Sequence, residues 1–526
     1  MSELNLTHGE VRSREAAEPR TTRDHAATPE RERIELAPGL VVGRIVTGMW
    51  QIADMERDGR RLDIDRAARD MAAYAEAGFD AFDMADHYGS AEDIAGRFNR
   101  LVDQGAVAGR NGSRPAIFTK WCPTPGPVTP EIVRAAVDRA RARLETPTID
   151  LLQFHWWTFQ HPAWLDAMHE LAKLQREGLI RHLGVTNFDT DHLRVLIKDG
   201  IAVATNQVCY SLLDRRAGEE MTAFCRAEGI KLLAYGTLAG GLLSEKWRGR
   251  PEPAASAIAD WSTMKYKRFV DAFGGWEVLQ GLLAALATVA ARHGVSLANV
   301  ATRWVLEQPV VGAVIIGARL GEREHRDDNR RLFGFSLDAA DQGLIEAALA
   351  PARRIPGDCG GEYRRPPYLT ASGDLSHHLR SFNPVYRAEP MPQRPSRLRI
   401  DTGSMWEPIC GYSRAVRIGD RILVSGTTAT HGSGRMVCPG DAHGQTVYVL
   451  DKLQASIESL GGRLEDVIRT RIFVRDQHQC EAIARAHGRY FGDVRPANTL
   501  VEVSALIGGY EVEIEAEAVV DHETQG

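Results

Sequence analysis

The chain has 526 residues, more than one hydrophobic core usually supports, so two or three domains are expected. Its 44% apolar and 25% charged residues are typical of a soluble globular protein. A net charge of -6 gives no electrostatic reason to expect binding to nucleic acid or to an acidic membrane.

The cysteines and the apolar runs indicate in which cellular compartment the protein is expected. Seven cysteines are dispersed without a CxxC pair, which argues against a disulfide framework and against a zinc site. No apolar run is long enough to cross a bilayer, and the first residues lack the apolar core of a signal peptide. We therefore expect a cytoplasmic protein with reduced thiols and no bound metal. We expect neither nucleic acid nor membrane as a partner.

The first part of the chain divides into a tail and an alternating pattern. Residues 1–32 carry many charges and few large apolar side chains, so they cannot offset the entropy of ordering, and we expect a disordered tail. From about residue 40 to 320, short apolar runs alternate with stretches of helical period, which is typical of a parallel sheet wrapped by helices. A closed (β/α)8 TIM barrel needs eight strands. The runs are 44–48, 79–85, 116–120, 149–155, 181–187, 203–208, 230–236 and 312–318.

A polar residue stands at the C-terminal end of six of these runs. A barrel places those ends on one face, so we expect the six side chains to converge around one pocket. Any one of them alone could be a satisfied polar residue at a strand end, but six together indicate a site. They are Asp83, Lys120, His155, Asn187, Gln207 and Tyr235.

The stretch FDMADHYGSAE (82–92) adds a tyrosine to this group. A phenol with a pKa of about 10 is a poor acid at neutral pH unless a cation stabilises its phenolate, and Lys120 could be that cation for Tyr88. A buried lysine needs a carboxylate partner, which Asp83 could provide. His155 could orient a carbonyl oxygen or share the proton relay. Such a group would protonate an oxygen as negative charge develops on it.

This stretch, together with FTK, LLQFH, GVTNF and IIGAR, resembles the aldo-keto reductases, which are NADPH-dependent (β/α)8 barrels. The resemblance spans about residues 33–350. It implies that Asp83, Tyr88, Lys120 and His155 form the catalytic tetrad. Tyr88 would be the proton donor, Lys120 would lower its pKa, Asp83 would hold the lysine, and His155 would position the substrate oxygen. Hydride would come from the nicotinamide, because no side chain can supply it.

The resemblance also implies which residues hold NADPH. Thr186, Asn187 and Gln207 correspond to the polar group on the nicotinamide carboxamide, and Tyr235 corresponds to the aromatic residue stacked on the ring. The remaining residues assigned to the nicotinamide end and to the loop over the pyrophosphate are Gly48, Met49, Trp50, Asp83, Gly236, Thr237, Leu238, Gly240 and Lys246.

At the adenosine end, Gly317, Arg319, Arg323, Asp328 and Asn329 correspond to the residues that grip the 2'-phosphate and adenine. The arginines favour NADP over NAD, because a 2'-phosphate needs a cationic, forked donor.

Beyond residue 350 the barrel pattern stops. Residues 351–396 are rich in Pro, Gly and Arg and indicate an irregular linker, partly packed on the barrel. From residue 397 a new pattern starts, with two strand-like runs joined at Gly419 and Asp420 as a hairpin. The elements then follow in the order ββαβαββ.

Residues 397–522 resemble the RidA/YjgF family, small α+β (chorismate mutase-like) domains that form trimers and, in active members, hydrolyse enamines and imines. The motifs are YSRAVRIGD, ILVSG, RPANTLVEVSAL and VEIEAEAV. Tyr412 and Glu513 correspond to pocket positions of that family. Active deaminases carry an arginine where this chain has Asn498, and a neutral amide cannot reproduce a bidentate grip on a carboxylate.

We therefore expect an NADPH-dependent oxidoreductase that reduces an aldehyde or ketone, fused to a RidA-like domain. That domain would be a trimerisation module, implied by family analogy alone, or a modified imine-binding pocket. Two alternatives stay open. The RidA-like domain could hydrolyse an imine whose product the barrel reduces, or the whole chain could be a non-catalytic NADPH sensor. The substrate is a small carbonyl or imine compound whose identity the sequence does not select, because loops set it.

Overall fold

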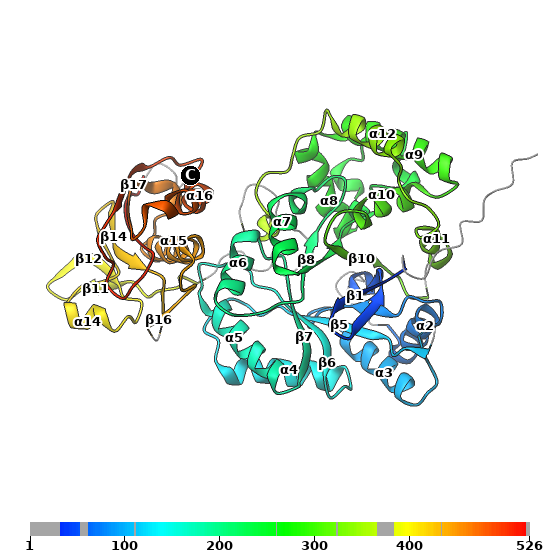
Figure 1. Cartoon of the computed structure of the whole chain (residues 1–526), viewed down its shortest axis with the longest axis horizontal. Coiled ribbons are helices and arrows are strands. Elements are labelled where there is room, and N and C mark those ends of the chain that lie inside the picture. Colours follow the sequence, from blue (N-terminus) through cyan, green and yellow to red (C-terminus); the bar gives the residue numbers. More distant parts are fainter. Residues whose placement is uncertain are drawn as a thin grey trace, which may run out of the picture.

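The computed structural model describes residues 32–52, 62–109, 112–258, 260–321, 325–364, 383–432 and 434–521. Two structural regions are present, a closed barrel and a seven-stranded sheet with helices (Figure 1). The tail expected at residues 1–32 falls outside the described residues except for Glu32.

The first region is a closed barrel of eight strands in the order β10-β3-β4-β5-β6-β7-β8-β9, all pairing in parallel. Each strand overlaps one of the apolar runs, so the predicted barrel is confirmed. The strands are β3 (Ile45–Gly48), β4 (Ala81–Asp83), β5 (Ala116–Trp121), β6 (Ile149–Phe154), β7 (Ile180–Thr186), β8 (Thr205–Cys209), β9 (Lys231–Tyr235) and β10 (Val311–Gly317).

Helices surround this barrel, and several of them begin at a side-chain cap. Asp63, Thr129, Asp189 and Ser296 each accept a backbone N–H in the first helical turn, which typically contributes about 1 kcal/mol. The helices are α2 (Ile64–Glu76), α3 (Ala91–Asp103), α4 (Pro130–Arg143), α5 (Ala163–Arg176), α6 (Thr190–Lys198), α7 (Glu220–Glu228), α8 (Trp261–Phe273), α9 (Trp276–His293), α10 (Leu297–Leu306), α11 (Arg326–Arg331), α12 (Ala339–Leu349) and α13 (Gly361–Arg364).

A hairpin closes the N-terminal end of the barrel. Strands β1 (Arg33–Ala37) and β2 (Leu40–Gly43) pair in antiparallel fashion. Leu36 and Leu40 are buried in one apolar cluster with interior residues such as Phe118. Because this end is filled, the opposite end, where the strands finish, is left to form a pocket.

The junction between α8 and α9 is sharply bent. The two helices meet at 98°, and Gly274 and Gly275 between them both have positive φ, which glycine adopts without steric cost. Among the described residues, no single helix has the length and apolar character needed to cross a membrane, although this bent pair taken together satisfies the same test of length and composition.

The second region is a seven-stranded sheet in the order β11-β12-β13-β14-β19-β17-β18. Its strands are β11 (Glu389–Met391), β12 (Arg394–Ile400), β13 (Ala415–Ile418), β14 (Arg421–Thr428), β17 (Val467–Val474), β18 (Ala497–Glu502) and β19 (Val512–Val519). The main helices are α15 (Ala442–Ser459) and α16 (Cys480–Phe491). The smaller elements are α14 (Trp406–Cys410), β15 (Thr430–His431) and β16 (Arg435–Met436).

The predicted ββαβαββ order is present from β13 to β19, and the predicted hairpin joins β13 to β14 with Ile418 opposite Arg421. Two strands precede it. Because β11 pairs with β12, the sheet begins at Glu389, within the range 351–396 that the sequence indicates as linker.

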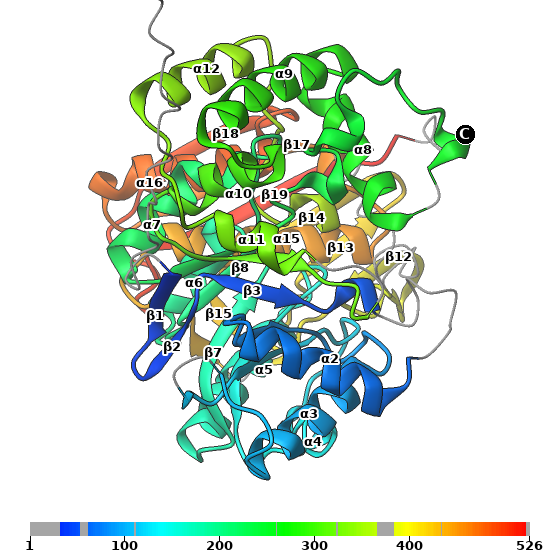
Figure 2. The ribbon, with the colours of Figure 1, turned by 90° about the vertical axis from the view of Figure 1, so that its right-hand side faces the viewer.

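The two regions meet through helices. Helix α6 of the barrel faces α15 of the second region (Figure 1). In the view turned by 90°, the barrel lies in front of the C-terminal sheet (Figure 2). The barrel therefore covers the helical side of the second region and leaves the outer face of its sheet open.

Candidate active site

One cavity of about 660 Å³ lies at the C-terminal ends of the barrel strands. All barrel residues that the sequence assigns to catalysis or cofactor binding line it, with the exception of Arg323, which lies outside the described residues. The residues brought together are Gly48, Met49, Trp50, Asp83, Tyr88, Lys120, His155, Thr186, Asn187, Gln207, Tyr235, Gly236, Thr237, Leu238, Gly240, Lys246, Gly317, Arg319, Asp328 and Asn329.

The centre of the cavity holds a buried ion pair. Lys120 Nζ lies 2.5 Å from Asp83 Oδ2 and donates to the Met84 carbonyl at 2.9 Å, and both side chains of the pair are about 5% exposed. Asp83 Oδ1 accepts from the amides of Gln153 and Gln207, each at 2.8 Å. A buried ion pair is stable only when such partners satisfy its remaining valences, and here they do. Sequence reasoning missed Gln153, which lies inside strand β6.

Tyr88 stands beside this pair in the turn between β4 and α3. Lys120 Nζ lies 5.3 Å from the centre of the Tyr88 ring. The rings of Trp50 and His87 meet Tyr88 edge-on at 5.0 and 4.9 Å. The phenol is thus held next to an ammonium group by two aromatic neighbours.

His155 lines the cavity and carries a nitrogen without a hydrogen-bond partner among the described residues. Its Nδ1 lies 3.2 Å from the Thr186 carbonyl, which can only accept, so Nδ1 carries the proton. Burial, together with the nearby Arg364, lowers the pKa of His155 well below its ordinary value, so the ring is neutral. Its buried Nε2 has no hydrogen-bond partner among the described residues. His155 therefore presents a lone pair as an acceptor.

Asn187 and Tyr235 form the neighbouring wall. Asn187 lies in the left-handed region with φ 57°, which asparagine tolerates better than most residues. The Tyr235 hydroxyl donates to Asn187 Oδ1 at 2.8 Å. Burial raises the pKa of Tyr235 well above its ordinary value, so this hydroxyl keeps its proton. Thr186 Oγ1 donates to the Gln207 carbonyl at 3.1 Å and ties β7 to β8.

The chain after the barrel also reaches this wall. Tyr363 accepts from Lys265 Nζ at 2.7 Å, and its hydroxyl lies 3.3 Å from that of Tyr235. Its ring lies 5.4 Å from that of His155 and 6.1 Å from that of Trp157. Both Tyr363 and Lys265 line the cavity, and neither was predicted.

The glutamate before Tyr363 fixes this segment to the barrel. Glu362 is paired with Arg216 at 2.8 Å, and Arg216 also pairs with Asp214 at 2.6 Å. Burial would raise the pKa of Glu362, but the attraction of Arg216 and Lys265 outweighs it and lowers the pKa. The carboxylate therefore stays charged and holds the segment over the barrel mouth.

The tryptophans near the strand ends divide into two pairs. Trp50 and Trp157 line the cavity, whereas Trp121 and Trp156 are buried among core residues. The indole N–H of Trp157 is buried without a partner among the described residues, so it is a spare donor beside His155.

A nicotinamide dinucleotide fits the residues present. The unpaired His155 Nε2 and the protonated Tyr235 stand at one end. Lys246 and Arg319 line the same cavity further along. Gly240, with φ 62°, lets the connecting loop pack against α8, since a Cβ there would lie 2.8 Å from the Ser262 carbonyl.

At the adenosine end, one of the assigned residues also has partners within the protein. Asp328 lies in α11 and lines the cavity, but its carboxylate accepts from Ser296 Oγ at 2.8 Å and from Asn299 at 3.2 Å. These two hydrogen bonds hold Asp328 against the first turn of α10 and so connect α11 to α10.

The residues assigned to the second region's pocket are only partly brought together. Tyr412 accepts from Arg414 at 3.0 Å, and Arg414 also donates to the Gly426 carbonyl, beside Glu513. Asn498 instead donates to Thr470 at 2.9 Å. Phe473 of β17 pairs with Glu513 on one side and with Val501 on the other. Val501 lies three residues beyond Asn498, so Asn498 is not in register with Glu513.

The fold and this site define a (β/α)8 barrel with a buried lysine–aspartate pair, an adjacent phenol and an unpaired imidazole. Residues 44–350, more than half of the chain, match the model of the aldo/keto reductase family, and the chain belongs to that family. Residues 402–520 match the model described as endoribonuclease L-PSP. Over 117 residues the chain is 32% identical to a RutC family protein of Pyrococcus horikoshii, covering 22% of this chain and 93% of that protein. The chain is thus a fusion of an aldo-keto reductase barrel and a RidA/YjgF domain.

Other relatives match the barrel. The chain is 30% identical over 257 residues to flagellar radial spoke protein 5 of Chlamydomonas reinhardtii, and 32% identical over 207 residues to protein tas of Escherichia coli. These matches cover 42% and 35% of this chain, and 49% and 58% of the relatives, so the chain spans about half the length of these two proteins. The solved glycerol dehydrogenase of Gluconobacter oxydans shares the fold, with a TM-score of 0.51 and 24% identity over 62% of this chain and 98% of that one.

Proposed function

We propose that the barrel reduces an aldehyde or ketone with NADPH and that Tyr88 donates the proton to the carbonyl oxygen. Bound in this cavity, the nicotinamide would supply the hydride to the carbonyl carbon. The observation that carries the proposal is the buried Lys120–Asp83 pair, 2.5 Å across, with Lys120 Nζ 5.3 Å from the Tyr88 ring in the same cavity as His155.

The acid is Tyr88. Negative charge develops on the carbonyl oxygen during reduction, so a proton donor is needed there. The ammonium of Lys120 stabilises the phenolate that remains after transfer. Because Gln153 and Gln207 hold Asp83, the ammonium keeps one position throughout. General acids of this kind contribute about 100-fold or more to the rate.

His155 orients a hydroxyl group. With its proton on Nδ1, the neutral ring accepts at Nε2 and has no proton to give to the carbonyl oxygen. It would accept from Tyr88 or from the alcohol that forms.

NADPH rather than NADH is proposed because of the charges along the cavity. Arg319 and Lys246 both line it, and a 2'-phosphate is best bound by a forked cationic donor. The seven free cysteines fit a reducing compartment, for which we propose the cytoplasm.

The test is NADPH oxidation with a panel of aldehydes and ketones. Tyr88→Phe should lower kcat by about 100-fold or more while NADPH still binds. Tyr210→Phe is the matched control, because that buried tyrosine lies outside the cavity lining. Turnover that survives Tyr88→Phe would refute the acid assignment. NADPH binding without turnover of any carbonyl would favour a sensor.

For the RidA/YjgF domain we propose an assembly role as a homotrimer. The barrel docks on the helical side through α6 and α15, and the outer sheet face carries Leu423 and Val501 at 44% and 41% exposure. Exposed apolar side chains in a sheet are a typical contact surface. Arg414 does not replace the arginine absent at Asn498, because both of its terminal nitrogens already donate to Tyr412, Gly426 and Thr427. We therefore expect no imine hydrolysis.

A further inference from the structure

The helix that joins the two regions starts at the proposed cofactor site. Strand β7 ends at Thr186, and Asn187 follows it on the cavity wall. Two residues later Asp189 caps α6, accepting from the backbone N–H of His192 at 2.9 Å. The outer side of α6 packs on α15 of the RidA/YjgF domain (Figure 1). The first turn of α6 therefore lies next to Asn187 at the nicotinamide end of the cavity, so a contact on this helix can influence that residue.

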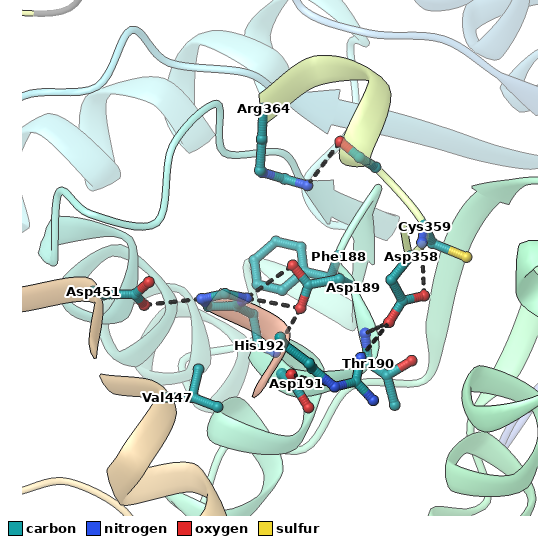
Figure 3. Close-up of polar contacts among 12 residues, drawn as sticks. Phe188, Asp189, Thr190, Asp191, His192, Asp358, Cys359, Arg364, Val447 and Asp451 are labelled. Atoms are coloured by element: carbon teal, nitrogen blue, oxygen red, sulfur yellow. Dashed lines mark hydrogen bonds and ion pairs between the residues drawn. The ribbon is translucent and has the colours of Figure 1, made fainter. Parts of the chain in front are cut away.

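His192 is clamped between the two regions. Its Nδ1 lies 2.7 Å from Asp189, and its Nε2 lies 2.9 Å from Asp451 of α15 (Figure 3). His192 and Asp451 are 6% and 7% exposed. Burial alone would lower the pKa of His192, but the attraction of the two carboxylates outweighs it and raises the pKa to about 9. The ring is therefore a cation at neutral pH, with both N–H groups donating.

A stack of flat groups continues from His192 toward the cavity. The His192 ring lies on Phe159 at 3.6 Å with 9° between the planes. The guanidinium of Arg364 lies 4.1 Å from the centre of the same Phe159 ring. Arg364 belongs to the strap, which we define as residues 358–364. It donates to the carbonyl oxygens of Asn187 at 2.5 Å and Trp156 at 2.6 Å.

Asn187 depends on these supports. Its φ of 57° is uncommon for a residue with a side chain and persists when the surroundings fix it. Its N–H donates to the Gln207 carbonyl at 2.8 Å, its side chain accepts from Tyr235, and its carbonyl accepts from Arg364. The strap packs so closely that a Cβ on Gly360 would lie 2.1 Å from the Asn187 carbonyl oxygen.

The strap is also tied to α6 and to the RidA/YjgF domain. Asp358 accepts from the Thr190 N–H at 2.8 Å, at the start of α6. Arg489 of α16 pairs with Asp191 at 3.0 Å and lies 3.5 Å from Asp358. The C-terminal domain thus contacts both elements that hold Asn187.

We propose that Asp451 is a positioning residue of the reductase: by fixing charged His192, it holds the Phe159–Arg364 stack and, through it, the carbonyl of Asn187. The inference rests on the proposed use of NADPH. Its consequence is that the RidA/YjgF domain forms part of the nicotinamide site without touching the cavity. Removing the Asp451 charge should therefore weaken cofactor binding through the loss of support for Asn187 on the cavity wall.

The test compares two His–Asp pairs across the same junction in the full chain. Asp451→Asn removes the charge that faces His192. Asp166→Asn removes the charge on α5 that faces His431 of β15 at 2.7 Å, and it leaves α6 and the strap in place. We expect Asp451→Asn to raise the Kd of NADPH, measured by fluorescence titration, about fivefold or more. Asp166→Asn should change it by less than about twofold.

The dependence of NADPH affinity on pH distinguishes a positioning role of Asp451 from a general loss of stability. The charged and titratable groups around His192 and its partner Asp189 include Asp451 of α15, Tyr490 of α16 on the other oxygen of Asp451, and Arg364 of the strap. Asp358 of the strap also belongs to this set, because burial and the charge of Asp189 raise its pKa to about 6, below the range in which His192 titrates. In the unchanged protein, NADPH affinity should fall as pH rises through about 9. In Asp451→Asn this fall should occur at a lower pH. The His192→Gln variant should bind NADPH weakly, and its affinity should not fall as pH rises through about 9.

Each outcome decides the proposal. Equal weakening in the Asp451 and Asp166 variants, or an unchanged Kd in Asp451→Asn, overturns the positioning role while leaving the proposed reductase intact. Failure of the unchanged protein to bind NADPH overturns both. If Asp451→Asn does not fold, His192→Gln and the unchanged protein still decide. A Kd that is flat from about pH 7 to about pH 10 excludes control by His192.

Discussion

The barrel mouth and the C-terminal sheet both carry paired charges, and they differ in how those charges meet water. Lys120 and Asp83 are 5% and 4% exposed, whereas Arg471 and Glu515 pair at 2.9 Å with 46% and 36% exposure. The first pair lines the cavity at the barrel mouth. The second lies on the sheet face that also exposes Val501 at 41%. The proposed chemistry depends on the phenol and the imidazole that line the same cavity as the buried pair, and the proposed assembly role depends on the open mixed face.

The largest effect should come from breaking the two ion pairs in parallel. Lys120→Met leaves Asp83 charged and buried without its cation, which should cost about 3–5 kcal/mol of unfolding free energy as well as turnover. Arg471→Met removes one partner of an exposed pair and should cost about 1 kcal/mol or less. Denaturant unfolding, followed separately for each region's transition, measures both. Equal costs would show that the barrel pair is not sealed from water.

The open sheet face can be tested by adding charge to it. If three copies meet there, Val501→Asp should dissociate the assembly, because burying an unpaired carboxylate in an interface costs several kcal/mol. Val41→Asp is the control, since Val41 is 50% exposed on the barrel hairpin β2. Analytical ultracentrifugation gives the mass of each variant. An unchanged chain that already sediments as a monomer would refute the homotrimer.

The contact between the regions has its own pH signature. The pKa of His192 is raised from 6.5 to about 9, so its contribution to stability is full below about pH 6.5 and is lost as pH rises through 9. One pKa unit corresponds to about 1.4 kcal/mol, so the loss should exceed that value. The Asp451→Asn variant should lose less stability over this pH range than the unchanged protein. Thermal unfolding across this pH range measures the loss, and identical curves for both proteins would contradict it.

The barrel and the positions of three polar residues at its strand ends could be predicted because their signals are local. Each strand is a short apolar run, and Asp83, Lys120 and His155 stand at fixed places where such runs end. Parallel closure of the barrel then brings the ends together without further information. The same reasoning placed Asn187 on the cavity wall, whereas Tyr88, five residues beyond the end of β4, was assigned from the stretch 82–92 and the family resemblance.

The sequence indicates that residues 351–396 pack partly on the barrel, but not that the strap reaches the cavity, because its position depends on long-range contacts. Residues 351–396 have no period that fixes a direction, and Tyr363 reaches the cavity only because Glu362 meets Arg216 and Arg364 meets Asn187. His192 gave no signal for a similar reason. Its partner Asp451 lies in a different domain, and no spacing in the sequence joins them.

The smallest effect should come from the hydroxyl of Tyr363. Tyr363→Phe keeps the ring beside His155 but removes the acceptor of Lys265, and one lost hydrogen bond is worth about 1 kcal/mol. We expect the KM for carbonyl substrates to rise about fivefold with a smaller change in kcat. Tyr510→Phe is the control in the other region, where that hydroxyl accepts from Thr430 at 2.6 Å and should not affect reduction. A fall in kcat as large as that of Tyr88→Phe would contradict the assignment of Tyr88 as the single proton donor, because only the acid should affect the rate that strongly.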